Sequence, residues 1–320
     1  MAYASVSSAF LMKLFSKHLD KRSEKTLIDM PVLYEFADKR PLPGKSGSTM
    51  FVPRHIARNG ITALTEFSIV TPSGTSAHYY SGTVAGYGDA KKYSDFLVSI
   101  AEVPTMISDD INAMTQYAAN KVDSLIITQL CGAGTWVSPD GATANTDVIE
   151  TTALKQRFLF DARATLGSKN APKYSDGYYW AAITPEGNHD LFVNTSAGNE
   201  LGSHLYRTDV GASKLQRATI GVLGGVRVLE TTNFTKLANG AGGISEGANS
   251  GYQGFVMGPG AVAAVDLTTA RLKSFIKNFG QAGIYDPIDQ VMTAGIKFYF
   301  CSIAMDTSNR LVRTAYGSTI

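Results

Sequence analysis

The chain has 320 residues, of which 44% are hydrophobic and 18% are charged, so it has enough apolar material to bury a sizeable core. Its formal net charge is only +2, which argues against a protein dedicated to DNA or RNA, because such proteins usually carry a basic excess or stripe. Cys131 and Cys301 lie in separate apolar stretches and favour a reduced place of assembly over a secreted disulfide framework. The sequence has neither a signal-peptide pattern nor an apolar run of ~20 residues, so no membrane partner is predicted.

Residues 1–48 are predicted to form an arm. A short amphipathic helix is expected over residues 7–19, with Phe10, Leu14 and Phe15 on one face. Three prolines follow between residues 31 and 43, so the segment can bury little by itself. We therefore expect the arm to lie across a neighbouring molecule, with those three side chains and Tyr34 in the contact.

Residues 49–92 are predicted to form an extended loop. Strands are expected over residues 49–53 and 96–101, and several Gly, Pro and Asn turn signals lie between them. Long loops within compact domains are usually functional, so the segment is interpreted as a protruding two-stranded hairpin. Its candidate contacts with a neighbouring molecule are Phe67, Ile69, Tyr79, Tyr80 and Tyr87.

Residues 108–130 carry the clearest helical pattern. A helix of that length measures roughly 33 Å at ~1.5 Å per residue, and Ser108, Asp109 or Asp110 can cap it. Polar residues, among them Asp123, are predicted to lie mostly on the solvent side. The core-facing stripe is predicted to comprise Ile111, Met114, Ala118, Val122 and Leu125, followed by Ile126 and Leu130.

The remaining pattern mixes helices and strands, which gives an α+β fold class with no internal repeat. A second helix is predicted over residues 151–166, a strand over 179–183 and a short helix from Pro185. Further strands are expected within 220–229, over 295–304 and over 311–315, the last two pairing with each other. Residues 237–250 are predicted to form a polar, Gly-rich loop.

No catalytic, cofactor-binding or metal site is predicted. Gly44-Lys45-Ser46 resembles the end of a phosphate-binding loop, but prolines precede it and a strand follows, so a plain turn is favoured. Ser245 stands in a Gly-x-Ser-x-Gly pattern without an apolar strand before it, which favours a surface loop over a nucleophile elbow. The five histidines do not pair at metal-ligand spacing, and neither cysteine joins them.

Several short motifs, in their order along nearly the whole chain, resemble a tailed-bacteriophage major capsid protein. The similarity is to the N-four-type branch of the Hong Kong ninety-seven-like (Johnson) fold. One departure is Ile296, where an aromatic residue is common in this branch. The motifs are residues 49–54, residues 104–130, Ile183-Thr184-Pro185 with Asp190-Leu191, residues 220–221, 224–228 and 230–233, residues 255–256 with 260–262, and Asp286-Pro287, Gln290 and residues 295–297.

The resemblance implies an N-terminal arm, an extended β-hairpin loop, a peripheral domain with a long spine helix, and an axial domain. Copies would form the pentamers and hexamers of an icosahedral or prolate head that encloses double-stranded DNA, assembled in the cytoplasm of the bacterial host. Implied partners are the chain itself, a separate scaffolding protein, a portal and a cement or decoration protein, with DNA held non-specifically. The corresponding segments are 1–48, 49–92, 93–183 with the spine helix at 108–130, 184–285, and 286–320, whose strands return to the peripheral domain.

Three alternatives remain open at this point. An encapsulin-type shell has the same fold but encloses cargo enzymes. A phage tail or baseplate component would give rings or tubes. A hydrolase would use Ser245 as its nucleophile.

The loop's lysine content generates a first prediction. Some shells of this fold join a loop lysine covalently to a neighbour's asparagine, whereas residues 51–90 contain no lysine and only Lys91 and Lys92 follow at the base of the loop. We expect denaturing gel electrophoresis of mature shells to give a monomer band. A covalent ladder whose link maps to this loop by mass spectrometry would contradict the prediction.

Overall fold

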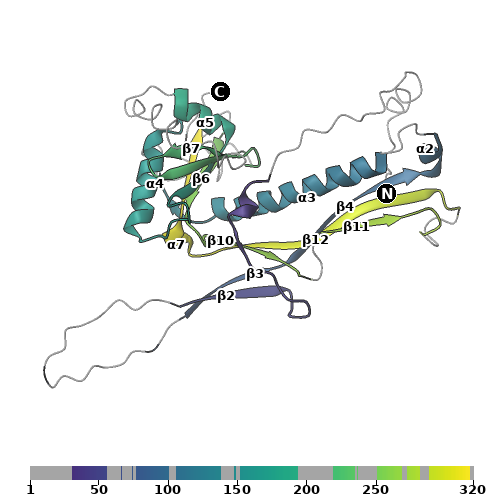
Figure 1. Ribbon diagram of the computed structural model, residues 1–320, viewed down its shortest axis with the longest axis horizontal. Helices are drawn as coiled ribbons and strands as arrows, with labels where there is room; N and C mark the ends of the chain where they lie inside the picture. Colours follow the sequence, from purple (N-terminus) through teal and green to yellow (C-terminus); the bar gives the residue numbers. More distant parts are fainter. Residues whose placement is uncertain are drawn as a thin grey trace. The chain divides into compact units, whose positions relative to one another are not determined.

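The structure is a computed structural model with a mixed α+β fold (Figure 1). Its residues form two compact units, which are described separately: unit 1 from Gly86–Lys121 and Ala270–Tyr299, and unit 2 from Pro31–Ala85, Val122–Thr269 and Phe300–Ile320. The helix expected over residues 7–19, Phe67, Ile69 and Ser245 lie outside the described residues. The structure describes residues 31–55, 66, 74, 77–100, 106–137, 148, 152–193, 219–234, 236, 251–268, 272–281 and 288–317.

Unit 2 contains a six-stranded sheet with two helices. Its fully buried core includes Phe158, Leu166, Tyr179 and Val256. The strands, in spatial order, are β5 (Thr135–Trp136), β13 (Leu311–Gly317), β9 (Gly251–Met257), β6 (Tyr179–Ile183), β8 (Val226–Glu230) and β7 (Thr219–Leu223), and the helices are α4 (Gln156–Ser168) and α5 (Pro185–Val193). The predictions of a strand over 179–183 and a helix from Pro185 are confirmed.

A second group of strands in unit 2 carries the end of the arm and the start of the loop. β1 (Asp38–Lys39) pairs in parallel with β10 (Val262–Asp266), and β10 pairs antiparallel with residues 300–304 of β12 (Val291–Ala304). β2 (Thr49–His55) and β3 (Ala77–Thr83) form a separate antiparallel ribbon, as the hairpin prediction required. Short helices are η1 (Leu33–Glu35) and α7 (Thr307–Arg310).

Unit 1 combines a small sheet with the first part of the long helix. β4 (Ala85–Ser94) and β11 (Lys273–Lys277) both pair with β12, and α2 (Asp95–Ile100) follows β4. Asp110 of α3 (Met106–Cys131) accepts hydrogen bonds from Lys91 Nζ at 2.5 Å and from the Tyr93 hydroxyl at 2.7 Å. Burial raises the pKa of Tyr93, and this hydrogen bond raises it further, so the hydroxyl keeps the proton that it donates.

The strand predicted over residues 96–101 is wrong. Residues 95–100 form α2, directly after β4 ends at Ser94. A short apolar run fits a strand and a helix equally well, and Asp95 in the first turn favours the helix through its dipole.

The pairing predicted for residues 311–315 is also wrong. All seven residues of β13 pair antiparallel with β9, from Leu311↔Met257 to Gly317↔Gly251, and Val312 and Arg313 pair with β5 on the other side. Six of the seven are buried, so β13 is an interior strand of the six-stranded sheet. Nearness in sequence to β12 therefore did not identify its partner.

Several element boundaries differ from the predicted ones. The long helix begins at Met106, so Ser108, Asp109 and Asp110 lie within it and do not cap it. The second helix begins at Gln156 and not at residue 151. The strand expected within 220–229 is two strands, because Gly224 and Gly225 adopt positive φ angles of 58° and 82° and turn the chain.

The Ile183-Thr184-Pro185 motif forms the start of α5, and Tyr316 holds it in place through hydrogen bonds. The Thr184 hydroxyl accepts a hydrogen bond from the Gly187 N–H at 3.2 Å, and Pro185 takes the first helical position of α5. The Tyr316 hydroxyl lies 3.0 Å from the Thr184 hydroxyl and accepts a hydrogen bond from the Thr184 N–H at 3.1 Å. A Cβ at Gly187 would lie 2.5 Å from that phenolic oxygen, so only glycine fits beside it.

Asp123 joins three distant segments of unit 2. Its side chain is fully buried on α3, contrary to the prediction of a solvent-side position. One carboxylate oxygen accepts the Leu33 N–H at 2.7 Å, at the start of η1, and the other accepts the Asn233 side-chain amide at 3.0 Å, after β8. Burial raises the pKa of Asp123, whereas the hydrogen bonds from Asn233 and the η1 backbone lower it.

Removing this carboxylate should destabilise the fold strongly. Asp123→Ala leaves the buried Leu33 N–H and the half-buried Asn233 amide without their acceptor, and we expect the free energy of unfolding to fall by about 2–5 kcal/mol. Urea denaturation followed by circular dichroism measures this change. The matched control is Asp161→Ala on α4, which removes an exposed pair with Arg157 and should cost less than about 1 kcal/mol. Equal losses in the two variants would contradict the role given to Asp123.

Candidate functional site

The β2–β3 ribbon is the candidate functional site, because it separates an inward apolar face from an exposed one. The strands pair from Thr49↔Thr83 to His55↔Ala77. Side chains on a strand point alternately to opposite faces. In β2, Val52 is buried and Met50 and Arg54 are half-buried, whereas Phe51, Pro53 and His55 are exposed.

The inward face of the ribbon packs on the β10 and β12 strands of unit 2. Val52 belongs to a buried cluster with Val265 and Ile303, and Met50 and Tyr80 pack against that cluster. A Cβ at Gly82 would lie 2.5 Å from Ile303 Cγ1 and 2.8 Å from Cys301 Sγ. The missing side chain at Gly82 therefore allows the ribbon to lie directly on β12.

The outward face of the ribbon is apolar and open. The side chains of Phe51 and Tyr79 are each 63% exposed, and Pro53 is the cross-strand partner of Tyr79. Among the residues that the structure describes, this ribbon has two strands and hence two outer edges. Exposed apolar side chains beside open strand edges are typical of a surface that binds another polypeptide.

A buried carboxylate holds the ribbon near the end of β2. Asp306, 5% exposed, forms ion pairs with Arg54 of β2 and, at 3.3 Å, with Arg310 of α7. Arg54 also donates to the Tyr80 hydroxyl at 3.4 Å. The hydrogen bond to Tyr80 and the interaction with Asp306 raise the pKa of Arg54 further, so its guanidinium stays charged. Asp306 itself adopts the left-handed conformation with φ of 45°.

The predicted contact residues have different surroundings in the structure. Tyr79 is exposed, Tyr80 packs against the inner cluster, and Tyr87 stacks on Phe298 at 5.4 Å within unit 1. Tyr34 lies 6.5 Å from the Phe300 ring. Phe10, Leu14, Phe15, Phe67 and Ile69 lie outside the described residues.

The predicted core residues of the long helix are covered to different degrees. Met114 and Ala118 are buried, and Ile111, Val122 and Leu125 are half-buried. Ile126, Ile127 and Leu130 are buried towards its C-terminal end.

Sequence reasoning missed Phe51, Arg54 and Asp306. The period-2 alternation of Met50, Val52 and Arg54 against Phe51, Pro53 and His55 could have identified the exposed phenylalanine. The pairing of Arg54 with Asp306 joins residues 252 positions apart, and no local pattern predicts it.

The described residues also show what becomes of the phosphate-loop-like motif, and whether they contain a metal cluster or a membrane-spanning helix. Gly44-Lys45-Ser46 forms a turn, in which Lys45 has a φ of 69° and the Ser46 hydroxyl donates to the Pro43 carbonyl at 2.5 Å. In the described part of the chain, no three His, Cys, Asp or Glu side chains gather as a metal site would require. No described helix has both the length and the apolar character needed to cross a membrane.

Solved structures of phage capsids resemble this chain over nearly its full length. The capsid of Ralstonia phage GP4 aligns with a TM-score of 0.74 and 10% identity, covering 96% of each chain. The capsid of cyanophage Pam1 aligns with a TM-score of 0.67 and 15% identity, covering 99% of each chain. The capsid of cyanophage P-SCSP1u aligns with a TM-score of 0.67 and 14% identity, covering 97% of this chain and 95% of that one.

No protein-family model and no curated protein matches the chain. Of the three comparisons, only the one with solved structures therefore gives information about this chain. The chain has the fold of phage capsid proteins, with an α+β architecture that extends over the same length as theirs.

The ion pairs of Asp306 with Arg54 and Arg310 should contribute to stability. Asp306→Asn keeps a residue that tolerates positive φ but removes the charge that both arginines contact. We expect the free energy of unfolding in urea to fall by about 1–3 kcal/mol. The control is Asp38→Asn, whose exposed pair with Arg40 should contribute less than about 1 kcal/mol. A loss at Asp306 no greater than at Asp38 would show that the ion pairs of Asp306 have little energetic importance.

Proposed function

We propose that this chain is the major capsid protein of a phage, in the N-four-type branch of the Hong Kong ninety-seven-like fold. The observation that carries the proposal is the likeness to three phage capsid proteins, which covers at least 95% of every chain compared. Copies assemble into pentamers and hexamers of an icosahedral or prolate head. The protein then acts as a structural component of the virion, not as an enzyme.

In this proposal the segments take the roles known for such shells. The β2–β3 ribbon is the stem of the extended loop, α3 is the spine helix, and β7, β8 and β9 of the six-stranded sheet belong to the axial domain of residues 184–285. The exposed Phe51 and Tyr79 then contact a neighbouring subunit. Many copies of such a small contact stabilise a closed shell together, although one alone is weak.

The remaining partners follow from the same proposal. A scaffolding protein assists assembly in the host cytoplasm, a portal occupies one vertex, and a cement or decoration protein binds the finished shell. The near-neutral net charge of +2 suits a shell that encloses double-stranded DNA without gripping it.

Electron microscopy of the expressed chain tests the proposal. We expect size-exclusion chromatography and negative staining to show closed, empty shells. The double variant Phe51→Ser/Tyr79→Ser should give soluble, folded subunits that do not close, because the outward face loses its apolar contacts. The control Phe160→Ser changes an aromatic side chain of α4 that is 43% exposed and should leave the shells intact.

Three outcomes would contradict the proposal. Rings or tubes would indicate a tail component, shells that copurify with a cargo enzyme would indicate an encapsulin, and monomers at every protein concentration would exclude self-assembly.

A further inference from the structure

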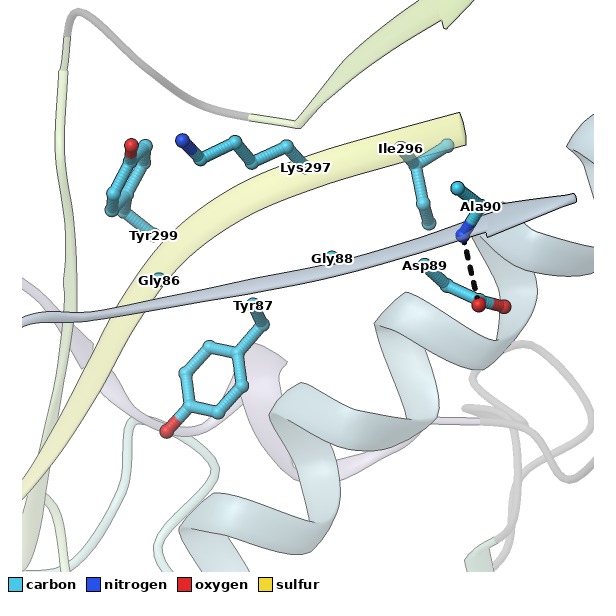
Figure 2. Close-up of a pocket in the computed structure, with 8 residues that line it drawn as sticks. All are labelled: Gly86, Tyr87, Gly88, Asp89, Ala90, Ile296, Lys297 and Tyr299. Carbon is cyan, nitrogen blue, oxygen red and sulfur yellow. Dashed lines mark hydrogen bonds between the residues drawn. The ribbon is translucent and has the colours of Figure 1, made fainter. Parts of the chain in front are cut away.

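The sheet of unit 1 has one covered and one open face. In β12, the residues at even positions, such as Ala294, Ile296 and Phe298, are buried. Figure 2 shows Tyr87 and Asp89 on the side of β4 that faces α3, whereas Lys297 and Tyr299 extend to the other side. Side chains alternate along a strand, so the open face carries the odd-numbered residues of β12 and the even-numbered residues of β4.

The strand registers place four lysines on this open face. Lys273 of β11 lies directly opposite Lys297, and Lys277 lies opposite Thr293. On the β4 side, Cβ atoms built at Gly88 and Gly295 approach Lys297 Cα and Ala90 Cβ at 3.7 Å and 3.0 Å. Those two pairs run antiparallel, so the next pair on the same face is Lys92 with Thr293.

The four lysines form two rows across the sheet. Lys273 and Lys297 make one row, and Lys92 and Lys277 make the other, about 13 Å away because four residues of a strand span that length. All four side chains are exposed, and the Lys297 ammonium lies 4.9 Å from the Tyr299 ring centroid. We name this surface, with the residues between its rows, the lysine face.

The strand residues that form the lysine face include no carboxylate. None of the odd-numbered β12, even-numbered β4 or odd-numbered β11 residues described here is Asp or Glu. The carboxylates of Asp89 and Asp110 lie on the α3 side, where Asp110 pairs with Lys91. Like charges directly opposite each other on a sheet are destabilising, so an anion bound between Lys273 and Lys297 would relieve a local repulsion.

Small residues at the lysine face let a polypeptide approach closely. A shallow hollow of about 560 Å³ lies along β4 and β12 at the Lys297 row and beyond it, with Gly86, Gly88 and Tyr299 in its lining (Figure 2). Phe275, 51% exposed, is the partner of Gly295 between the two rows. Aromatic side chains beside a small-residue floor are typical of protein–protein contacts.

We propose that the lysine face binds an acidic segment of another protein in an extended conformation. Alternate side chains of an extended segment point to the same side, so acidic residues at every second or fourth position reach both lysine rows. Residues 1–30 and 56–76 do not supply such a run, because they contain five Lys and Arg against three Asp and Glu, and one Arg and one Glu, respectively. Residues 138–151 are acidic, but Asp140, Asp147 and Glu150 are seven and three positions apart, which fits neither spacing.

A peptide-binding experiment on the full-length chain tests this inference. The probe is a fluorescein-labelled decapeptide of alternating Glu and Ser, with alternating Gln and Ser as its neutral counterpart. Fluorescence anisotropy should show binding of the Glu peptide alone, with an affinity that falls as salt rises, because screening weakens exposed charge interactions. Lys273→Gln/Lys277→Gln should weaken this binding by about tenfold, equivalent to ~1.4 kcal/mol.

A matched variant and a second probe make the result decisive. Lys45→Gln/Lys236→Gln removes the same charge from exposed lysines of unit 2 and should change the affinity less than twofold. Equal weakening in both double variants, or no binding of the Glu peptide, would overturn the inference. A labelled DNA duplex that binds more tightly than the peptide, and loses affinity in Lys273→Gln/Lys277→Gln, would overturn it in favour of nucleic acid. Size-exclusion chromatography of the same samples reports shell formation independently, so a failure here is distinguishable from a failure of the proposed function.

Discussion

The carboxylate of Asp123 is the constraint on which unit 2 depends most directly. A fully buried aspartate is costly unless every oxygen has a donor, and here the donors come from the end of the arm and from the turn after β8. The long helix thereby fixes the positions of Leu33 and Asn233, which are 90 and 110 residues away from Asp123 in sequence. Hydrophobic contacts are tolerant of small shifts, whereas a carboxylate with two short hydrogen bonds allows one arrangement of the three segments.

Asp306 is a second buried carboxylate that holds a distant segment, in this case the ribbon. Both carboxylates are buried, and each binds a segment that is distant in sequence. Asp123 receives the backbone of η1, and Asp306 pairs with Arg54 of the ribbon. The ribbon can therefore leave Phe51 and Tyr79 exposed, since an ion pair at Arg54 and the inner cluster around Val52 hold it in place. Under the proposed function, the contacts that stabilise the fold would thus be different from those that join the copies.

Sequence predicted the elements whose burial is uniform. Residues 179–183 were predicted correctly because all five are buried and Thr184-Pro185 ends the strand with a helix start. A two-stranded hairpin and its first strand were predicted, but β3 at residues 77–83 was not, because the second strand was expected over residues 96–101. Residues 96–101 were not predicted correctly, because a six-residue apolar run has no period that distinguishes helix from strand. Asp123, Arg54 and Asp306 could not be assigned, because their partners are brought together only by the tertiary fold and a polar residue on a helix usually faces water.

Cryo-electron microscopy of the purified, assembled chain tests the central claim most directly, because it resolves both the particle and the subunit. The account predicts a closed shell of pentamers and hexamers, in which each subunit has this fold, Asp123 contacts Leu33 and Asn233, and the outward face of the ribbon lies against a neighbouring subunit. A reconstruction in which the subunits form rings or tubes, or in which Phe51 and Tyr79 face solvent in a closed shell, would contradict it.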